Sequence, residues 1–121
     1  MSDDAVDRAR EYYRALDEHD YEALAALLAP DFVHDRPDTT LEGRDRFVRF
    51  MREERPQKDT RHPIDDIFES TAARGRDGDD AGGDVAVRGR LLAADGEPIT
   101  TFVDVFTFDG EDVARIDTFT R

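Results

Sequence analysis

Apolar residues in the N-terminal half of the chain recur at the spacing of helices that bury one face. Four of them share one face of a helix predicted over residues 3–17: Val6, Ala9, Tyr13 and Leu16. A second, short helix is predicted between Asp20, which can cap its first turn, and Pro30, which ends it. A short extended piece separates it from a third helix, which begins at Gly43 and stops before Pro56.

Beyond the third helix the pattern changes to that of β-strands. Four strands are predicted, at residues 62–73, 84–92, 99–108 and 112–120. Asp95 and Asp109 are each followed by glycine, a pair that favours tight hairpin turns, so the last three strands are predicted to form an antiparallel meander. The Gly- and Asp-rich loop at residues 75–83 is predicted to be mobile. The order predicts one α+β domain over residues 1–121, with three helices packed on one face of a curved sheet.

Charge and composition exclude several classes of function. The formal net charge of −13 repels nucleic-acid phosphates and anionic membranes, and the absence of cysteine excludes disulfides and thiolate-bound metals. No apolar run is long enough to span a membrane and the N-terminus does not resemble a signal peptide, so we expect a cytoplasmic protein. Sixteen Arg against one Lys, and 21 Asp against 9 Glu, indicate a halophilic source, where molar salt screens charge within about 3 Å.

Two short sequence segments resemble those of a known family. Residues 29–33 read Ala-Pro-Asp-Phe-Val, residues 102–106 read Phe-Val-Asp-Val-Phe, and both strings lie at matching places in the order of elements. The chain resembles the nuclear transport factor 2-like superfamily, and within it the SnoaL-like and ketosteroid-isomerase-like branch. The resemblance implies a cone-shaped curved sheet around three helices, an apolar cavity for a small hydrophobic molecule, and no cofactor. It also implies a homodimer through the outer sheet face, where Val103 and Val105 would otherwise face water.

The resemblance also places candidate catalytic residues. Tyr12 matches the family's catalytic tyrosine in the first helix, and Asp104 matches its oxyanion-hole aspartate. The family's general base is an aspartate directly before a proline. Here Arg36 precedes Pro37 and Asp35 lies one step earlier, on the opposite side of an extended segment. Isomerisation by the family's mechanism is therefore not expected.

The residues around Asp104 are also unusual when the family resemblance is left aside. Its neighbours at alternate positions are Phe102 and Phe106, and burial among them would raise its pKa and leave a neutral proton donor. The alternative is an outward Asp104, paired with an arginine of a neighbouring strand: Arg88, Arg90 or Arg115. Strand alternation does not decide between the two faces, because Val103 and Val105 make the other face apolar too.

The remaining candidates surround the predicted cavity. His34 falls on the same side as Phe32 and Arg36, where it could act as an acid or base or instead hydrogen-bond the next turn. His62 is expected to be a partly exposed strand end, and the spacing of the histidines predicts no metal site. We expect ten residues to contact a ligand: Tyr13, Phe32, Arg36, Phe47, Phe50, Met51, Phe102, Phe106, Ile116 and Thr118.

Two classes of function follow from these residues. The first is a cofactor-independent acid–base enzyme (isomerase, cyclase or hydrolase-like) on a small hydrophobic substrate, with Asp104, Tyr12 and His34 as catalytic residues. In it we expect a protonated Asp104 within hydrogen-bond reach of Tyr12, and Arg36 near the cavity mouth. The second is a non-catalytic ligand-binding or dimeric assembly domain. An open cavity with convergent polar groups would favour the first class, whereas phenylalanines filling that space would indicate a structural role.

Overall fold

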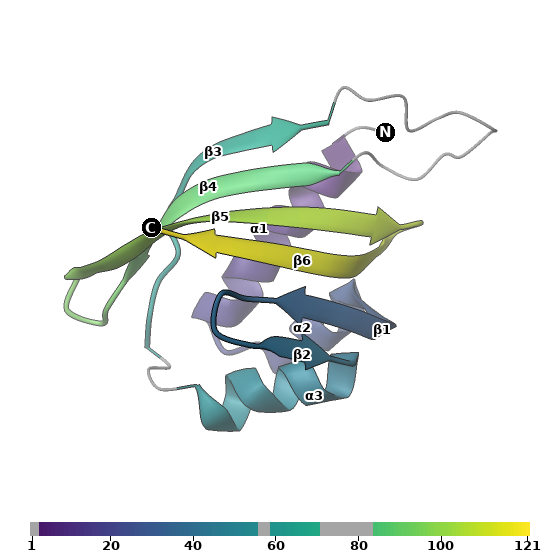
Figure 1. Ribbon diagram of the computed structural model, residues 1–121, viewed down its shortest axis with the longest axis horizontal. Coiled ribbons are helices and arrows are strands. Elements are labelled where there is room, and N and C mark those ends of the chain that lie inside the picture. The colour runs from purple at the N-terminus through teal and green to yellow at the C-terminus, as the bar shows by residue number, and fades with distance from the viewer. Residues whose placement is uncertain (1–2, 56–58, 71–83) are drawn as a thin grey trace.

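The computed structural model describes residues 3–55, 59–70 and 84–121 (Figure 1). Over these residues, two helices, two strands and a third helix are followed by four more strands. The six strands form one curved sheet that does not close into a barrel, so the predicted α+β fold is confirmed. The predicted mobile loop at residues 75–83 lies outside the described residues.

The helices lie close to their predicted positions. They are α1 (Asp3–Asp17), α2 (Tyr21–Leu27) and α3 (Arg44–Arg49), and α3 continues into a short π-helical stretch, η1 (Phe50–Glu54). Asp20 caps α2 as predicted, because its side chain accepts a hydrogen bond from the Ala23 N–H at 3.2 Å. Gly43 precedes α3 with a φ of 97°, a backbone conformation that favours glycine.

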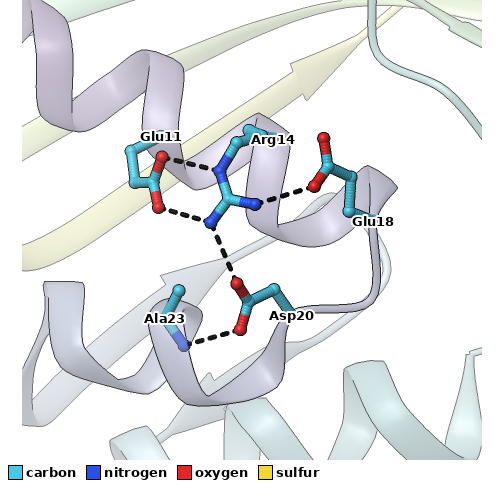
Figure 2. A network of polar contacts seen from close by, with 5 residues as sticks. All are labelled: Glu11, Arg14, Glu18, Asp20 and Ala23. Carbon is cyan, nitrogen blue, oxygen red and sulfur yellow. Dashed lines mark hydrogen bonds and ion pairs between the residues drawn. The ribbon is translucent and has the colours of Figure 1, made fainter.

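An exposed group of charged residues, the Arg14 network, joins α1 to α2 (Figure 2). The Arg14 guanidinium donates to Glu11 on its own helix, to Glu18 directly after that helix, and to Asp20 at the start of α2. The hydrogen bond from Arg14 lowers the pKa of Glu11, and the Ala23 N–H together with Arg14 lowers that of Asp20. The network therefore favours the charged forms of Glu11 and Asp20.

The six strands are β1 (Leu28–Asp35), β2 (Thr40–Glu42), β3 (Ile64–Glu69), β4 (Val85–Leu92), β5 (Pro98–Asp109) and β6 (Asp112–Thr120). Their order in the sheet is β2-β1-β6-β5-β4-β3. Strands β4 to β6 form the predicted antiparallel meander, and β3 extends it beside β4, but β1 pairs parallel with β6 and antiparallel with β2. The sheet is therefore mixed.

Among the differences from the sequence prediction, two concern β1 and β2. Leu28 begins β1 instead of ending α2, because it pairs with Val113 of β6 and both side chains are buried there. This tertiary contact outweighs the helix propensity of leucine. The short strand β2 was not predicted, since only Leu41 of its three residues is buried.

Figure 1 shows α1 lying across one face of the sheet, and the core fills the space between them. Alternate residues of β5 point into this space: Phe102, Asp104, Phe106 and Phe108 are all buried. The outward alternative for Asp104 is therefore wrong. The arginines considered for it pair with other carboxylates: Arg88 with Asp66, Arg90 with Asp65, and Arg115 with Asp35 and Asp117.

Candidate functional site

A cavity of about 460 Å³ opens between the C-terminal half of α1 and the sheet. Its wall includes eight residues that the sequence singled out: Tyr12, Tyr13, His34, Arg36, Met51, Phe102, Asp104 and Thr118. The lining mixes aromatic and aliphatic surface with a few polar groups, which is the usual composition of a small-molecule site. The cone is therefore not filled by its aromatic residues.

Five residues expected to contact a ligand lie outside the cavity lining: Phe32, Phe47, Phe50, Phe106 and Ile116. Phe106 and Ile116 are paired across β5 and β6, one inward position deeper than Asp104 and Thr118, and neither is exposed. Phe32 and Phe47 pack on each other with their ring centroids 4.9 Å apart. Phe32, Phe47, Phe106 and Ile116 are fully buried outside the cavity lining, and the ligand contacts expected of the five residues stay a prediction.

The register of the sheet brings Asp104 and Thr118 together. They are Cα partners on β5 and β6, and both side chains point inward. The Thr118 hydroxyl donates to Asp104 Oδ1 at 2.6 Å, and the Tyr13 hydroxyl donates from α1 to Asp104 Oδ2 at 2.5 Å. Asp104 is 6% exposed, and this burial raises its pKa although both hydrogen bonds act in the opposite direction. Asp104 is therefore shifted toward the neutral acid.

His34 extends this chain of contacts onto a third strand. It pairs with Ile116 in the parallel β1–β6 register, and Thr118 is the next residue of β6 on the same face. Its Nε2 lies 2.8 Å from the Thr118 hydroxyl oxygen. Burial, helped by the positive charge of Arg36, lowers the pKa of His34 to about 3, so its ring is neutral near pH 7. We call these four residues the buried network: Tyr13, Asp104, Thr118 and His34.

The tyrosine that bonds Asp104 is Tyr13, so the expected contact with Tyr12 is wrong. The two rings are edge to face, 5.0 Å apart, and Tyr12 packs against Phe106 at 5.3 Å. Tyr13 lies on the apolar stripe of α1, and this stripe faces the sheet and the cavity between them. Burial raises the pKa of both tyrosines well above the ordinary value, so both phenols stay protonated.

Arg36 and Asp35 point in different directions, as their alternation predicts. Arg36 lines the cavity and forms an ion pair with Asp38 at 3.2 Å, and its guanidinium lies over the Phe50 ring, 5.0 Å from the centroid. The Asp38 side chain is 70% exposed, which places this pair at the cavity mouth. Asp35 instead contacts Arg115 at 3.2 Å and accepts a hydrogen bond from Thr40. The carboxylate nearest to the family's base position is therefore engaged outside the cavity.

Sequence reasoning missed His62 and Asp17. His62 was expected to be a partly exposed strand end; its side chain is 14% exposed, and the structure places it in the cavity wall, which was not predicted. Its Nδ1 lies 2.6 Å from Asp17 Oδ1, at the end of α1. Forty-five positions separate the two residues. Nothing in the sequence pattern pairs them, because their contact depends on how the chain leading into β3 passes the end of α1.

Comparison with known proteins agrees with this geometry. The chain belongs to the SnoaL-like family, whose domain model matches residues 9–116. A proposed ketosteroid isomerase from Kribbella flavida DSM 17836 superposes with a TM-score of 0.79 at 24% identity, covering 98% of this chain and 78% of that one. A proposed polyketide cyclase from Sinorhizobium meliloti has a TM-score of 0.76 at 20% identity, covering 98% of this chain and 99% of that one. Likeness at these identities shows the fold.

Three further findings concern another solved structure, the curated proteins and membrane spans. A Methylobium petroleophilum PM1 protein of unknown function with a cystatin-like fold has a TM-score of 0.80 at 14% identity, covering 99% of this chain and 77% of that one. A search of curated proteins found no match. Within the described ranges, no helix is both long enough and apolar enough to cross a membrane.

Proposed function

We propose that this chain, as one SnoaL-like domain over residues 1–121, is a cofactor-independent acid–base enzyme acting on a small hydrophobic molecule. The observation that carries the proposal is Asp104: a carboxyl that is nearly fully buried, shifted toward its neutral form and placed in the wall of the 460 Å³ cavity. That volume lies in the range of small-molecule sites, which runs from about 300 to 1,000 Å³.

The chemistry follows from the buried network. When Asp104 is neutral, the Tyr13–Asp104 pair holds two protons, so a ligand oxygen can accept one of them while the other stays in the hydrogen bond between the two residues. In a site with little water, such donors stabilise negative charge that develops on that oxygen during reaction. Thr118 and His34 hold the other side of the carboxyl in place. Tyr13 thus takes the role that the sequence assigned to Tyr12, which instead contributes wall surface.

The walls and the mouth suggest the kind of substrate. Met51 and Phe102 offer apolar surface, and Arg36 at the mouth would suit a carboxylate or phenolate group of the ligand. Two proteins of similar fold are described as a proposed ketosteroid isomerase and a proposed polyketide cyclase. These features support an alicyclic or aromatic ketone or phenol as the substrate class.

A thermal-shift screen of small cyclic ketones, phenols and hydrophobic acids tests the proposal. A ligand at a hundred times its dissociation constant should add about 2.7 kcal/mol of stability to the wild-type protein. Asp104→Asn should weaken the binding of ketones and phenols, whereas Asp109→Asn, an exposed change at the far end of the same strand, should leave it unchanged. The proposal fails if no compound stabilises the protein, or if Asp104→Asn binds ketones and phenols as tightly as the wild type.

A non-catalytic ligand-binding or dimeric assembly domain is the second candidate. It is favoured by Asp35, which is held outside the cavity by Arg115 and so supplies no base at the family's position. Ligands found in the screen separate the two candidates when they are incubated with the protein in D₂O. An enzyme should exchange hydrogens on carbons next to the ligand carbonyl, and NMR should follow their loss. A binding domain should leave these hydrogens in place.

We also propose a homodimer through the outer sheet face. Phe119 on β6 is 60% exposed and lies opposite Val103 of β5, so apolar side chains continue across two strands of that face. A second copy would remove them from water. Light scattering at micromolar concentration in high salt should give the mass of a dimer, and the mass of a monomer would contradict this assembly.

The acidic composition supports the proposed halophilic source. Excess negative charge repels itself more strongly as salt is lowered and the screening distance grows. The melting temperature should therefore fall markedly between molar and about 0.1 M salt. An unchanged melting temperature over that range would argue against adaptation to salt.

A further inference from the structure

His62 and Asp17 form a second polar pair at the cavity, separate from the buried network. Asp17 ends α1, and its carboxylate accepts from two groups of His62: Oδ1 lies 2.6 Å from the ring Nδ1, and Oδ2 lies 3.1 Å from the backbone nitrogen. Both side chains are largely shielded, with 14% of His62 and 28% of Asp17 exposed. One carboxylate therefore holds His62 at two points.

This contact decides which ring nitrogen is available. Because Nδ1 faces the carboxylate at hydrogen-bond distance, it carries the proton of the neutral ring, and Nε2 keeps its lone pair. Among the described residues, none forms a hydrogen bond to Nε2. The ring packs beside two wall residues, with centroids 5.7 Å from Tyr13 and 5.9 Å from Phe102. Tyr13 also bonds Asp104, so the pair adjoins the acidic side of the site.

The other candidate bases of this site are already engaged. His34 Nε2 contacts Thr118, and burial of this histidine lowers its pKa to about 3, which makes it a weak base. Asp35 is paired with Arg115 outside the cavity. Asp104 is shifted toward the protonated form. His34 Nδ1 also has no hydrogen-bond partner, but it is buried on the weakly basic ring, so His62 Nε2 is the better placed base in the described part of the cavity wall.

We infer that His62 is the general base of the cavity and that Asp17 is its positioning residue, acting on substrates with an acidic C–H next to a carbonyl. The inference rests on the proposed function, in which the Tyr13–Asp104 pair donates a hydrogen bond to the carbonyl oxygen of the substrate. The C–H proton passes to Nε2, and the electron pair of that bond forms the C=C bond of an enolate. Its negative charge collects on the oxygen bonded by Tyr13 and Asp104. The imidazolium then returns the proton to the same or a conjugated carbon, so the step needs no co-reactant.

The ring tautomer gives a readout that does not depend on activity. Nitrogen-15 NMR, recorded at a pH where the ring is neutral, should show His62 protonated on Nδ1 and bare on Nε2 in the wild-type protein. Asp17→Ala should give a mixture of tautomers, and Asp17→Glu should restore part of the Nδ1–H form. A wild-type ring protonated on Nε2 would overturn the inference.

5-Nitrobenzisoxazole serves as a probe of the base itself. Transfer of its C–H proton to Nε2 breaks the N–O bond and forms a nitrile and a coloured phenolate, so no other reactant is needed. The wild-type rate should exceed that of free imidazole, and His62→Ala should lower kcat by about 100-fold. Added imidazole should restore part of that loss. Asp17→Ala should lower kcat less than His62→Ala, with little change in KM.

A matched control and a separate binding measurement keep the outcomes distinct. His19→Asn replaces an exposed histidine at a residue with a φ of 58°, which asparagine tolerates, and should leave the rate unchanged. A wild-type rate equal to that of free imidazole, or a His62→Ala rate equal to wild type, overturns the role of His62. The proposed function fails on a different result, namely the absence of any stabilising ligand in the thermal-shift screen.

Discussion

The buried network and the Arg14 network are built from similar groups, yet their central carboxyls behave in opposite ways. Asp104 accepts two hydrogen bonds and its pKa is raised, because burial outweighs the bonds. Asp20 also accepts two, from the Ala23 N–H and from Arg14, and these bonds lower its pKa because little burial opposes them. Because the number of hydrogen bonds is the same, burial and the charge of the donor decide the direction in which each pKa moves: Asp104 is buried with neutral donors, and Asp20 has solvent access and a cationic donor.

The two networks also differ in how far apart their members lie in the chain. Arg14 bonds residues three, four and six positions away. The contacts of the buried network span 14, 84 and 91 positions and join one helix to three strands. Local spacing is enough to form the first network, whereas the second exists only when the sheet and α1 are assembled. Breaking the two networks should therefore have different consequences.

The largest effect should come from acidification. The folded protein holds His34 neutral with a pKa of about 3, while the unfolded chain protonates it near 6.5. The unfolded state therefore binds the extra proton first, and stability falls as the pH drops from 6.5 toward 3. Between pH 6.5 and 4 the loss due to His34 should be about 3 kcal/mol. Urea unfolding at several pH values gives the free energy of unfolding of the wild type and of His34→Gln, which keeps a donor toward Thr118. The difference between the two slopes of this free energy against pH measures the loss due to His34.

The exposed histidine supplies the control for this experiment. His19→Asn should keep the full acid sensitivity of the wild type, because His19 lies at the surface of the α1–α2 junction. If His34→Gln loses stability on acidification as steeply as the wild type does, His34 is not held neutral by burial.

Removing one hydroxyl from the buried network should have the next largest effect. Thr118→Val keeps the shape of the side chain but leaves Asp104 Oδ1 and His34 Nε2 without their partner. The cost should be about 1–3 kcal/mol in the free energy of unfolding, measured by urea denaturation. Thr101→Val, an exposed change on β5, should stay within about 0.5 kcal/mol of wild type. Equal costs at the two positions would show that the buried hydroxyl contributes nothing.

The two carboxyls should respond to pH with opposite signs when each is replaced by asparagine. Asp104 stays protonated to a higher pH in the folded protein than in the unfolded chain, because its folded-state pKa is raised. The wild type therefore loses stability as pH rises above about 3.8, and Asp104→Asn gains stability relative to it. Each unit by which the Asp104 pKa is raised corresponds to about 1.4 kcal/mol. Asp20 is stabilised in its charged form, so Asp20→Asn should lose relative to wild type as pH rises. Unfolding curves at pH 4 and pH 7 measure the Asp104 effect, and curves at about pH 3 and pH 7 measure the Asp20 effect, whose window lies mainly below its ordinary pKa of 3.8. Equal signs would contradict the comparison.

The smallest effect should follow Arg14→Met, which removes the centre of the exposed network but keeps a long side chain. Exposed ion pairs contribute little, and salt screens them. The destabilisation should be smaller than that of Thr118→Val in dilute buffer and should shrink further in about 1 M salt. The Thr118→Val loss should not depend on salt, because no exposed charge is involved. A salt-independent loss for Arg14→Met would place its role in packing.

Much of the fold was predictable from residues close together in the chain. The bounds of α1 follow from its apolar spacing, the start of α2 from the Asp20 cap, and the β5–β6 hairpin from the Asp-Gly pair at its turn. Asp104 stood out as a carboxyl between phenylalanines, although the apolar pattern on both sides of β5 left its direction open. Each of these signals reflects a preference that acts over a few residues.

What the tertiary structure alone decided is which distant residues meet. It chose Tyr13 over Tyr12 as the partner of Asp104, because the rotation of α1 over the sheet sets which ring reaches β5. It also placed Leu28 in a strand beside β6 and brought His62 to Asp17. A sequence pattern reports the face on which a side chain lies, but a contact across 45 or 91 positions depends on the register and tilt of packed elements. Those are properties of the assembled core, where burial then sets the protonation of Asp104 and His34.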